Sequence, residues 1–147
     1  MSLLIRKATI HDANDVALLF DAYRVWYHQE SNINKATEFL AERLQNDQSV
    51  IFVAEEEGKL IGFTQLYPIF SSVSMSKTWL LNDLFVAESH RGKGIASNLL
   101  NAARKHGCET GSKWLMLQTS CDNAAAQALY EKTGWRKETD LFYMLDL

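Results

Sequence analysis

The sequence predicts a single α/β domain, in which a mixed sheet of six to seven strands is flanked by about four helices. The chain has 147 residues, a length typical of one domain, so residues 1–147 are assigned to a single unit. Its hydrophobic fraction of 47% is enough to build a core. Short apolar runs alternate with helical patterns along the chain, and this alternation favours the α/β class.

The N-terminal third is predicted to form one strand and two helices. Residues 3–7 are the first strand. A shorter second helix is predicted around residues 36–44. Between them, apolar residues at three- and four-residue spacing share one face of a helix: Val16, Leu19, Phe20, Tyr23, Trp26 and Tyr27.

The middle of the chain predicts a hairpin and a third strand. Residues 49–55 and 60–67 are strands joined by a polar turn that contains Gly58. Pro68 is expected to end or bend the second strand, because proline cannot donate to a strand ladder. After a serine-rich loop, the apolar run of residues 78–86 predicts a strand buried on both faces.

The C-terminal part predicts two helices and the remaining strands. A glycine-rich connection leads from residue 86 into a helix that we expect to end at Gly107, since glycine is a common helix stop. A strand at residues 114–119 and a helix at residues 124–132 follow. Residues 135–147 are expected to supply one or two closing strands.

Composition and charge argue against several classes of function. The formal net charge is −3 and no dense run of Lys or Arg occurs, so no nucleic-acid partner is expected. No apolar run approaches the ~20 residues of a membrane helix, and the N-terminus lacks the plan of a signal peptide, so no membrane partner is expected. Cys108 and Cys121 lack the spacing of a disulfide framework or a metal site. We therefore expect a cytoplasmic protein without a bound metal.

The loop that follows residues 84–86 carries the most chemical information. It contains Gly92 and Gly94, which let an anion approach the backbone closely, and it opens a helix whose first amides lack internal partners. Arg91 and Lys93 add positive charge beside these amides. The pattern therefore predicts a binding site for a phosphate or diphosphate group.

Two common phosphate loops fit this segment less well. A Walker A loop requires G-x-x-x-x-G-K-[ST], which the segment does not provide. The dinucleotide fingerprint requires a third glycine where this chain has Ser97. The two glycines are also compatible with an ordinary turn between a strand and a helix, and on their own they leave that alternative open.

Four segments together resemble the GNAT superfamily of N-acetyltransferases. From Arg91 to Ala96 the loop has the pattern [RQ]-x-x-G-x-[GA], which is similar to the acetyl-CoA signature after the family's fourth strand. Segments 6–13, 58–62 and 123–135 resemble the opening strand and helix, the second hairpin and the closing motif of the family. The resemblance covers most of the chain, and it implies a twisted, mostly antiparallel sheet that splays at its central strands.

The resemblance implies acetyl-CoA as the acetyl donor and points to the residues that would hold it. Backbone groups of Phe85 and Val86 would pair with the pantetheine arm. Asn123 would bond the same arm, and it would also suit the cap of the following helix. One segment would hold the diphosphate through its amides: Arg91, Gly92, Lys93, Gly94, Ile95 and Ala96.

Tyr130 occupies the position where family members often place the general acid that meets the departing CoA thiolate. The usual pKa of tyrosine is near 10 and that of a thiol is about 8.5. Complete proton transfer would be uphill by about 2 kcal/mol, so a strong hydrogen bond to the thiolate is an equal alternative. A core tyrosine on an amphipathic helix is the alternative without a catalytic role.

The attacking amine has to lose a proton, because an amine with a pKa near 10.4 is neutral in only about one molecule in 2,500 at pH 7. Asp83 is the candidate base, directly or through water, and a structural acid near the loop is the alternative. Some polyamine-acetylating relatives carry Glu where this chain has Asn82, and protein-acetylating members carry Glu where it has Leu80. Neither of those two carboxylates is therefore present here.

The segment from Asn82 to Val86 resembles the histone- and polyamine-acetylating branch of the superfamily, which suggests a cationic amine as the acceptor. Aromatic rings and a carboxylate can hold such a cation. Trp26 and Tyr27 also continue an apolar helix face, so a core position is the alternative for both. The residues expected to bind the acceptor are Trp26, Tyr27, Glu30, Tyr67 and Asn82.

The sequence thus predicts transfer of an acetyl group to the primary amine of a small cationic molecule, such as a polyamine or a related metabolite. The alternatives are transfer to a protein lysine or N-terminal amine, a non-catalytic acyl-CoA-binding module, and a domain for another phosphate ligand. A homodimer is a further expectation, because relatives are often dimers and strands near the C-terminus could pair.

Overall fold

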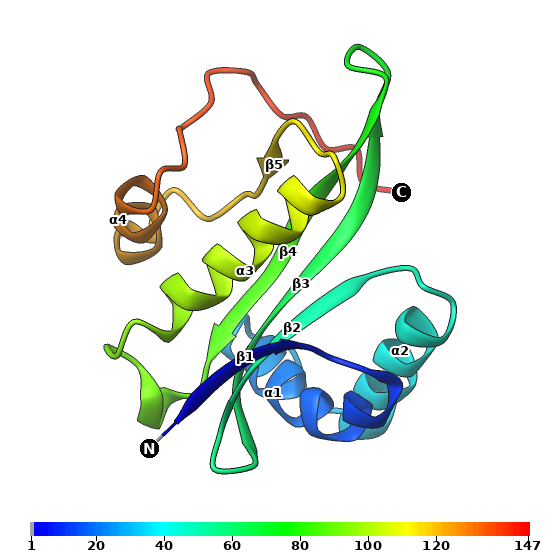
Figure 1. Cartoon of the computed structure of the whole chain (residues 1–147), viewed down its shortest axis with the longest axis vertical. Coiled ribbons are helices and arrows are strands. Elements are labelled where there is room, and N and C mark those ends of the chain that lie inside the picture. The colour runs from blue at the N-terminus through cyan, green and yellow to red at the C-terminus, as the bar shows by residue number, and fades with distance from the viewer. Residues whose placement is uncertain (1) are drawn as a thin grey trace.

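The computed structural model describes residues 2–147 and contains a five-stranded sheet with helices on both faces (Figure 1). In sheet order the strands are β1 (Leu3–Lys7), β2 (Val50–Glu56), β3 (Lys59–Ser71), β4 (Ser76–Val86) and β5 (Leu115–Met116). The helices are α1 (Ala13–Trp26), α2 (Ile33–Gln45), α3 (Ile95–Glu109) and α4 (Ala124–Lys132), and short 3₁₀ turns occur at Ile10–Asp12 and Glu88–His90. Neighbouring strands are antiparallel except β4 and β5. The α/β class is confirmed, with five strands instead of six to seven.

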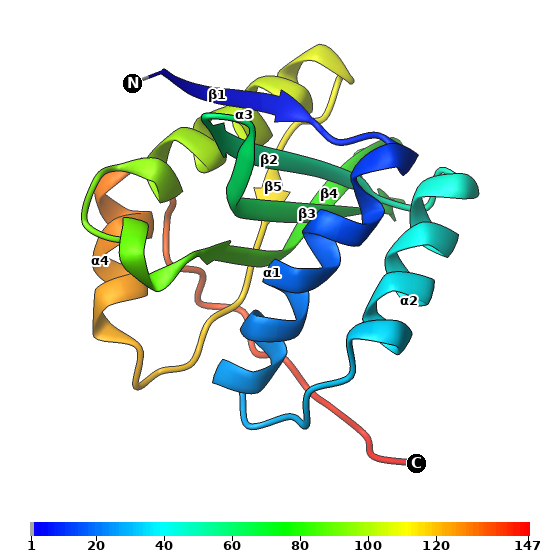
Figure 2. The same cartoon turned by 90° about the horizontal axis from the view of Figure 1, so that it is seen from below.

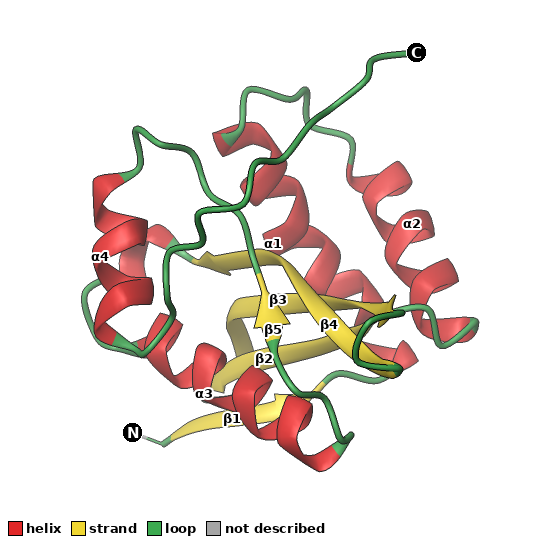
Figure 3. Cartoon of the chain, turned by 90° about the horizontal axis from the view of Figure 1, so that it is seen from above, coloured by secondary structure: helices red, strands yellow, loops and turns green. Residues whose placement is uncertain are grey.

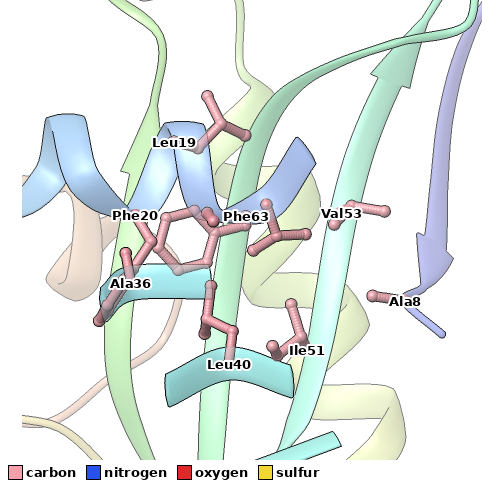
Figure 4. Close-up of a cluster of buried hydrophobic side chains, with 10 residues drawn as sticks. Ala8, Leu19, Phe20, Ala36, Leu40, Ile51, Val53 and Phe63 are labelled. Carbon is pink, nitrogen blue, oxygen red and sulfur yellow. The ribbon is translucent and has the colours of Figure 1, made fainter. Parts of the chain in front are cut away.

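Helices α1 and α2 cover one face of the sheet (Figure 2). Alternate residues of β2 point toward this face, as the two-residue period of a strand requires, and Phe63 of β3 lies beside them (Figure 4). This packing fixes the position of α1, whose C-terminal end borders the candidate site. The buried cluster comprises Ala8, Val16, Ala17, Leu19, Phe20, Ala36, Leu40, Ile51, Val53 and Phe63.

Helix α3 covers the opposite face. Its residues Leu100 and Ala103 are buried against Leu66 of β3 and Leu81 of β4. Toward the N-terminus of α3, Ile95 belongs to a neighbouring buried cluster. The first turn of α3 is therefore held firmly against the sheet, and its free amides keep a fixed position.

Strand β4 carries a bulge and then parts from β5. Gln65 pairs with Asp83 and Leu66 pairs with Leu81, so Asn82 is the extra residue that lies between two pairs. Pairing of β4 with β5 stops at Leu80. Beyond that residue, the outer edge of β4 has no strand partner among residues 2–147. This is the splay that the family resemblance implied.

Two predicted element ends were wrong. Strand β3 continues through Pro68, because beyond Leu66 it pairs with β4 alone and a proline is tolerated at such a local edge. Helix α3 continues past Gly107. A Cβ at Gly107 would lie 2.9 Å from Cδ2 of Leu115, so close packing against β5 requires the glycine.

The C-terminal segment also differs from the prediction. Residues 133–147 contain no strand, so the expected closing strands are absent, and the chain after α4 runs to its end as a loop (Figure 3). Strand β5 is limited to two residues, instead of spanning residues 114–119, because its neighbour β4 diverges from it. Apolar pattern alone could not reveal that these runs lack a partner strand.

Three further features concern the described residues 2–147. None of the helices there is long and apolar enough to cross a membrane. Among these described residues, no group of three or more His, Cys, Asp or Glu side chains is arranged to hold a metal ion. Cys108 and Cys121 are both exposed and are not joined by a disulfide.

Candidate active site

A cleft of about 650 Å³ opens where β4 and β5 diverge. Its walls are residues 81–82 and 84–86 of β4, residues 117–119 after β5, the start of α3, helix α4 and the C-terminal end of α1. The open edge of β4 lies in this cleft, so backbone groups that a partner strand would otherwise occupy can meet a ligand.

Backbone amides at the start of α3 have no partners inside the protein. Among the described residues, the N–H groups of 92–97 make no hydrogen bond, whereas that of Asn98 donates to the carbonyl of Gly94 at 3.1 Å. Gly92 and Gly94 have φ angles of 78° and 79°, which residues with a Cβ rarely adopt. The helix start also carries about half a positive charge, so this turn suits an anion. Of its residues, Gly92, Gly94, Ile95, Ala96 and Ser97 line the cleft, whereas Lys93 does not.

Arg91 offers its side chain to the cleft, but not its backbone amide. The N–H of Arg91 donates to the carbonyl of Glu88 at 3.3 Å, so this amide is already used within the loop, contrary to the prediction. Its Nε donates to the carbonyl of Val86 at 2.9 Å, and its guanidinium lies 5.3 Å from the centre of the Phe85 ring. These contacts hold a positive charge beside the free amides.

Helix α4 forms the opposite side of the cleft at the end where α3 begins. Asn123 caps the helix, since its Oδ1 accepts a hydrogen bond from the N–H of Ala126 at 3.1 Å. Its Nδ2 makes no hydrogen bond within residues 2–147 and can donate to a ligand in the cleft. Lys132 and His90 also line the cleft, so its α3 end is rich in cationic and donor groups.

Tyr130 of α4 lines the same cleft and is half-buried. Burial raises the pKa of its hydroxyl, and the neighbouring Tyr27 raises it further. The ring packs against Trp135, with centroids 6.2 Å apart. Tyr130 is therefore a protonated donor at neutral pH, held in place by an aromatic neighbour.

Asp83 lies behind the cleft and does not line it. Its side chain is buried with 4% exposure. Oδ2 accepts a hydrogen bond from Nε2 of Gln65 at 2.7 Å, and Oδ1 accepts one from Nδ2 of Asn82 at 3.1 Å. Burial raises the pKa of Asp83, while hydrogen bonds from Gln65 and Asn82 act in the opposite direction, as does the nearby Tyr23 hydroxyl, which donates to the carbonyl of Asn82 at 3.5 Å. The result is a carboxylate that takes up a proton more readily than an exposed aspartate does.

A chain of buried polar groups continues from Asp83 into the protein. The hydroxyl of Ser49 donates to Oε1 of Gln65 at 2.8 Å, which fixes the amide so that its Nε2 faces Asp83. Ser49 and Gln65 are themselves buried. On the cleft side, Asn82 and Tyr23 both contact Asp83 and both line the cleft. Asp83 can therefore exchange a proton with the cleft only through such a neighbour or through water.

The residues predicted for the acceptor fall into two groups. Trp26, Tyr27 and Asn82 line the cleft, and Trp26 is 54% exposed and Tyr27 47% exposed, so the core alternative does not hold for these two. Glu30 is exposed and does not line the cleft. Tyr67 lies on β3 outside the cleft, where burial, with a contribution from Asp83, raises its pKa to about 12.

The comparison with protein families decides the identity of this site. The family model described as "Acetyltransferase (GNAT) family" matches residues 16–135, which is most of the chain and includes every wall of the cleft. The chain belongs to the GNAT acetyltransferase family. It is an N-acetyltransferase, and acetyl-CoA is its acetyl donor.

Individual relatives agree with this assignment. An uncharacterized N-acetyltransferase of Bacillus subtilis, YhfO, is 49% identical over 92% of this chain and 91% of its own length. A crystal structure of a probable acetyltransferase, 39% identical, has a TM-score of 0.93 and covers 98% of this chain and 97% of its own. An aminoglycoside N-acetyltransferase solved in complex with CoA has the same fold, with a TM-score of 0.84 at 23% identity over 99% of this chain and 96% of its own.

The GNAT site contains residues that the sequence did not single out. Gln65 holds Asp83 through a side-chain hydrogen bond and is itself held by Ser49, and Tyr23 and Lys132 line the cleft. Gln65 does leave a signal, because it is a polar residue inside an apolar strand run, and buried polar side chains are uncommon. Its partner 18 residues later could not be named without the register of β3 on β4.

Proposed function

We propose that the chain transfers the acetyl group of acetyl-CoA to the primary amine of a small cationic molecule, and that the cleft between β4 and β5 is where this happens. One observation carries the proposal. Residues 92 and 94–97, which have free amides, line one cleft together with the open edge of β4 and Tyr130. One cleft therefore holds amides that can bind a diphosphate, a strand edge that can pair with an extended arm, and a hydroxyl that can donate a hydrogen bond, which are the groups that a CoA thioester needs.

The donor is held through its charged end. The amides of residues 92–97, with the positive end of α3, bind the diphosphate, and the Arg91 guanidinium adds charge beside it. The Nδ2 of Asn123 and the open backbone edge at Phe85 and Val86 hold the pantetheine arm. These groups fit the donor because the turn has space, as a Cβ at Gly92 or Gly94 would meet no atom within 4 Å.

In the reaction, the amine nitrogen bonds to the acetyl carbon, the bond from that carbon to sulfur breaks, and the amine loses one proton. Asp83 receives that proton through the Tyr23 hydroxyl or a water molecule, since the carboxylate itself is buried behind the cleft. Its raised pKa suits this task, because a base is most effective when its pKa approaches the working pH. Asn82 keeps one carboxylate oxygen oriented toward the cleft.

Tyr130 assists the departing thiolate. Its hydroxyl is protonated at neutral pH, because burial raises its pKa, so it is a hydrogen-bond donor. The same shift makes complete proton transfer to sulfur more uphill than for an ordinary tyrosine. We therefore assign Tyr130 a strong hydrogen bond to the thiolate, and the sulfur of CoA takes its proton from solvent.

The acceptor is proposed to be a small molecule with an amine, such as a polyamine or a related metabolite. Trp26 and Tyr27 present exposed rings to the cleft, and aromatic faces attract ammonium groups. No carboxylate lines the cleft among the described residues, and Asp83, which contacts Asn82 and Tyr23 of the cleft wall, supplies negative charge from behind it. An aminoglycoside N(6')-acetyltransferase of Salmonella typhimurium, 28% identical over 69% of this chain and 73% of its own length, supports a small acceptor with several amines.

The test is release of free thiol from acetyl-CoA in the presence of an amine panel. The panel comprises polyamines, aminoglycosides, free amino acids, and basic peptides with either a lysine or an unblocked N-terminus as the only amine. A small polyamine or aminoglycoside should give the highest kcat/KM. If only peptides are acetylated, the acceptor is a protein. If the chain binds acetyl-CoA and no amine releases thiol, a non-catalytic module replaces the proposal.

A further inference from the structure

The two carboxylate oxygens of Asp83 have different surroundings. Oδ2 accepts a hydrogen bond from Nε2 of Gln65 at 2.7 Å, and Gln65 is completely buried. Oδ1 accepts a hydrogen bond from Nδ2 of Asn82 at 3.1 Å, and Asn82 lines the cleft. Oδ2 therefore faces the interior of the protein, whereas Oδ1 lies on the side from which a proton of the substrate arrives.

The register of the sheet brings Gln65 and Asp83 together. The two residues are directly paired across β3 and β4, so their side chains lie on the same face of the sheet. Phe63 stands two residues before Gln65 and packs against Phe20 of α1, so this is the face that α1 covers. A polar side chain buried on an apolar face is destabilising unless its polar atoms have partners. Gln65 therefore needs a partner at each end of its amide.

Ser49 determines which end of the Gln65 amide faces Asp83. The hydroxyl of Ser49, a residue that is 4% exposed, donates to Oε1 of Gln65 at 2.8 Å. Since Oε1 can only accept, turning the amide over would break this bond and would place Oε1 against the carboxylate of Asp83. The hydrogen bond from Ser49 thus commits the donating end of the amide to Asp83.

This commitment decides what the carboxylate can do. Oδ2 already accepts the N–H of Gln65, so a proton that reaches Asp83 binds to Oδ1. A donor at Oδ2 also favours the ionised carboxylate, which is the form that can take up a proton, whereas burial favours the protonated form. The interior hydrogen bonds therefore act on the reactivity of an oxygen that lies on the other side of the carboxylate.

We propose that Gln65 and Ser49 are positioning residues of acetyl transfer: Ser49 orients the Gln65 amide, and this amide holds Asp83 so that Oδ1 receives the amine proton. The inference rests on the proposed function of Asp83 as the proton acceptor. In this step the bond from the amine nitrogen to its proton breaks, the proton passes through a water molecule or is exchanged at the Tyr23 hydroxyl, and an O–H bond forms at Oδ1. Gln65 and Ser49 keep their own protons throughout.

The ionisable side chains around Asp83 leave its titration distinct. Tyr23 of α1 and Tyr67 of β3 both interact with Asp83, and burial raises the pKa of each, that of Tyr67 to about 12. Both tyrosines are therefore neutral at and below neutral pH. The further ionisable groups that act on these two tyrosines are Arg43, Tyr27 and Tyr130. Arginine stays charged and the tyrosines stay neutral in this range, so Asp83 is the group that changes its charge there.

The first experiment titrates Asp83 without substrate, from the NMR signal of its carboxyl carbon in the full chain labelled at aspartate. The signal is assigned by its absence from Asp83→Asn. Gln65→Met removes the donor and keeps a similar length, so the midpoint should rise by about one pH unit or more. Ser49→Ala should raise it by less, because the amide remains but is free to turn.

Thr64→Val is the matched control for this titration. Thr64 is as buried as Gln65, and its hydroxyl donates to the backbone carbonyl of Asp83 at 2.7 Å. The control therefore removes a buried hydrogen bond to the same residue without touching the carboxylate, so it should lower the Tm and leave the midpoint unchanged. An unchanged midpoint in Gln65→Met would overturn the proposal. If Gln65→Met does not fold, an unchanged midpoint in Ser49→Ala would overturn it.

The second experiment measures the pH profile of kcat at saturating acetyl-CoA and amine, which reports the groups that titrate in the complex. In Gln65→Met the acidic limb should move to higher pH, so kcat falls about tenfold below the limb and approaches the wild-type value above it. Adding Ser49→Ala to Gln65→Met should move the limb no further, because Ser49 acts through the amide.

The outcomes separate this inference from the proposed function. An equal loss of kcat at every pH would show that Gln65 supports only the fold, and it would overturn the inference. A limb that stays in place while the NMR midpoint moves would show that another group accepts the proton, which overturns the inference and leaves acetyl transfer intact. A wild-type chain that releases no thiol with any amine would overturn both.

Discussion

The side-chain amide of Gln65 donates a 2.7 Å hydrogen bond to the buried carboxylate of Asp83. The hydroxyl of Ser49 holds the same amide from the other side at 2.8 Å. This arrangement fixes an acid in a position where burial makes its charged form unfavourable. A residue that is costly when ionised and is nevertheless held in orientation by two neighbours is expected to serve the chemistry of the site rather than the stability of the fold.

Asp83→Asn should therefore reduce catalysis strongly. The variant removes the proposed proton acceptor and keeps a similar shape, so kcat/KM for the best amine should fall about 100-fold or more. The affinity for CoA, measured by calorimetry, should change less than about twofold, because the amides proposed to bind the diphosphate lie at the start of α3. Asp15→Asn, at an exposed acid of α1, is the control and should retain wild-type activity. An active Asp83→Asn enzyme would show that Asp83 is a structural acid.

Asp83→Asn should lose activity, but its stability relative to wild type should increase as the pH rises. Because the pKa of Asp83 is raised in the folded protein, the folded state holds the proton more tightly than the unfolded chain does. Stability contributed by the protonated form is present at low pH and is lost as the pH rises through the raised pKa. The Tm of Asp83→Asn relative to wild type should therefore increase over the interval in which the pH rises above 3.8, the usual pKa of the group. A relative Tm that falls over this interval would contradict the direction of the shift.

Tyr130→Phe should slow acetyl transfer and leave donor binding intact. Loss of the hydrogen bond to the thiolate is expected to lower kcat about tenfold or more, with the Kd for acetyl-CoA unchanged. Tyr67→Phe is a matched control, since Tyr67 is a half-buried tyrosine outside the cleft. If both variants turn over at the wild-type rate, the leaving group is assisted by another residue.

Gly94→Ala and Gly58→Ala form a pair that separates strain from function. Both glycines have a φ angle of 79°, and a Cβ at either would meet nothing within 4 Å. Each substitution should therefore cost about 1 kcal/mol of unfolding free energy, or a few degrees in Tm. Only Gly94→Ala should also weaken CoA binding, by several-fold, because its turn presents the diphosphate amides. Equal CoA affinity in the two variants would argue against the proposed binding of the diphosphate by the turn at Gly94.

Asp12 should stabilise the fold in a pH-dependent way. Two hydrogen bonds of 2.9 Å join it to the Arg6 guanidinium, and this pairing lowers its pKa from 3.8 to about 2. A lowered pKa gives stability that is present above the unfolded value and is lost as the pH falls from 3.8 toward about 2. Asp12→Asn should lose about 2 kcal/mol in urea unfolding at pH 7 and almost nothing near pH 2. An equal loss at both pH values would exclude an ionic cause.

Local patterns in the sequence were sufficient for much of this structure. The strand at Leu3–Lys7 and the helix at Ala124–Lys132 lie where the apolar spacing placed them, and the turn at Gly92 and Gly94 has the left-handed backbone that its glycines indicated. These features depend on residues that are close together in the chain. They could be predicted because propensity, capping and backbone freedom act locally.

The remaining features depend on partners far apart in the chain. The hydrogen bond from Gln65 to Asp83 follows from the register of two strands, and the extension of α3 past Gly107 follows from its packing on Leu115. Residues 135–147 were expected to supply one or two closing strands, but they form none, and a local pattern does not reveal whether a partner edge lies within reach. Composition can show that a segment needs covering, while the topology decides what covers it.

The most direct test of the account is a calorimetric titration of the purified chain with CoA and, in parallel, with pantetheine. Pantetheine has the thiol arm but lacks the diphosphate that the amides of residues 92–97 are proposed to hold. If these amides hold the diphosphate, CoA should bind saturably and pantetheine should bind at least about 100-fold more weakly. No binding of CoA, or equal affinity for the two compounds, would contradict it.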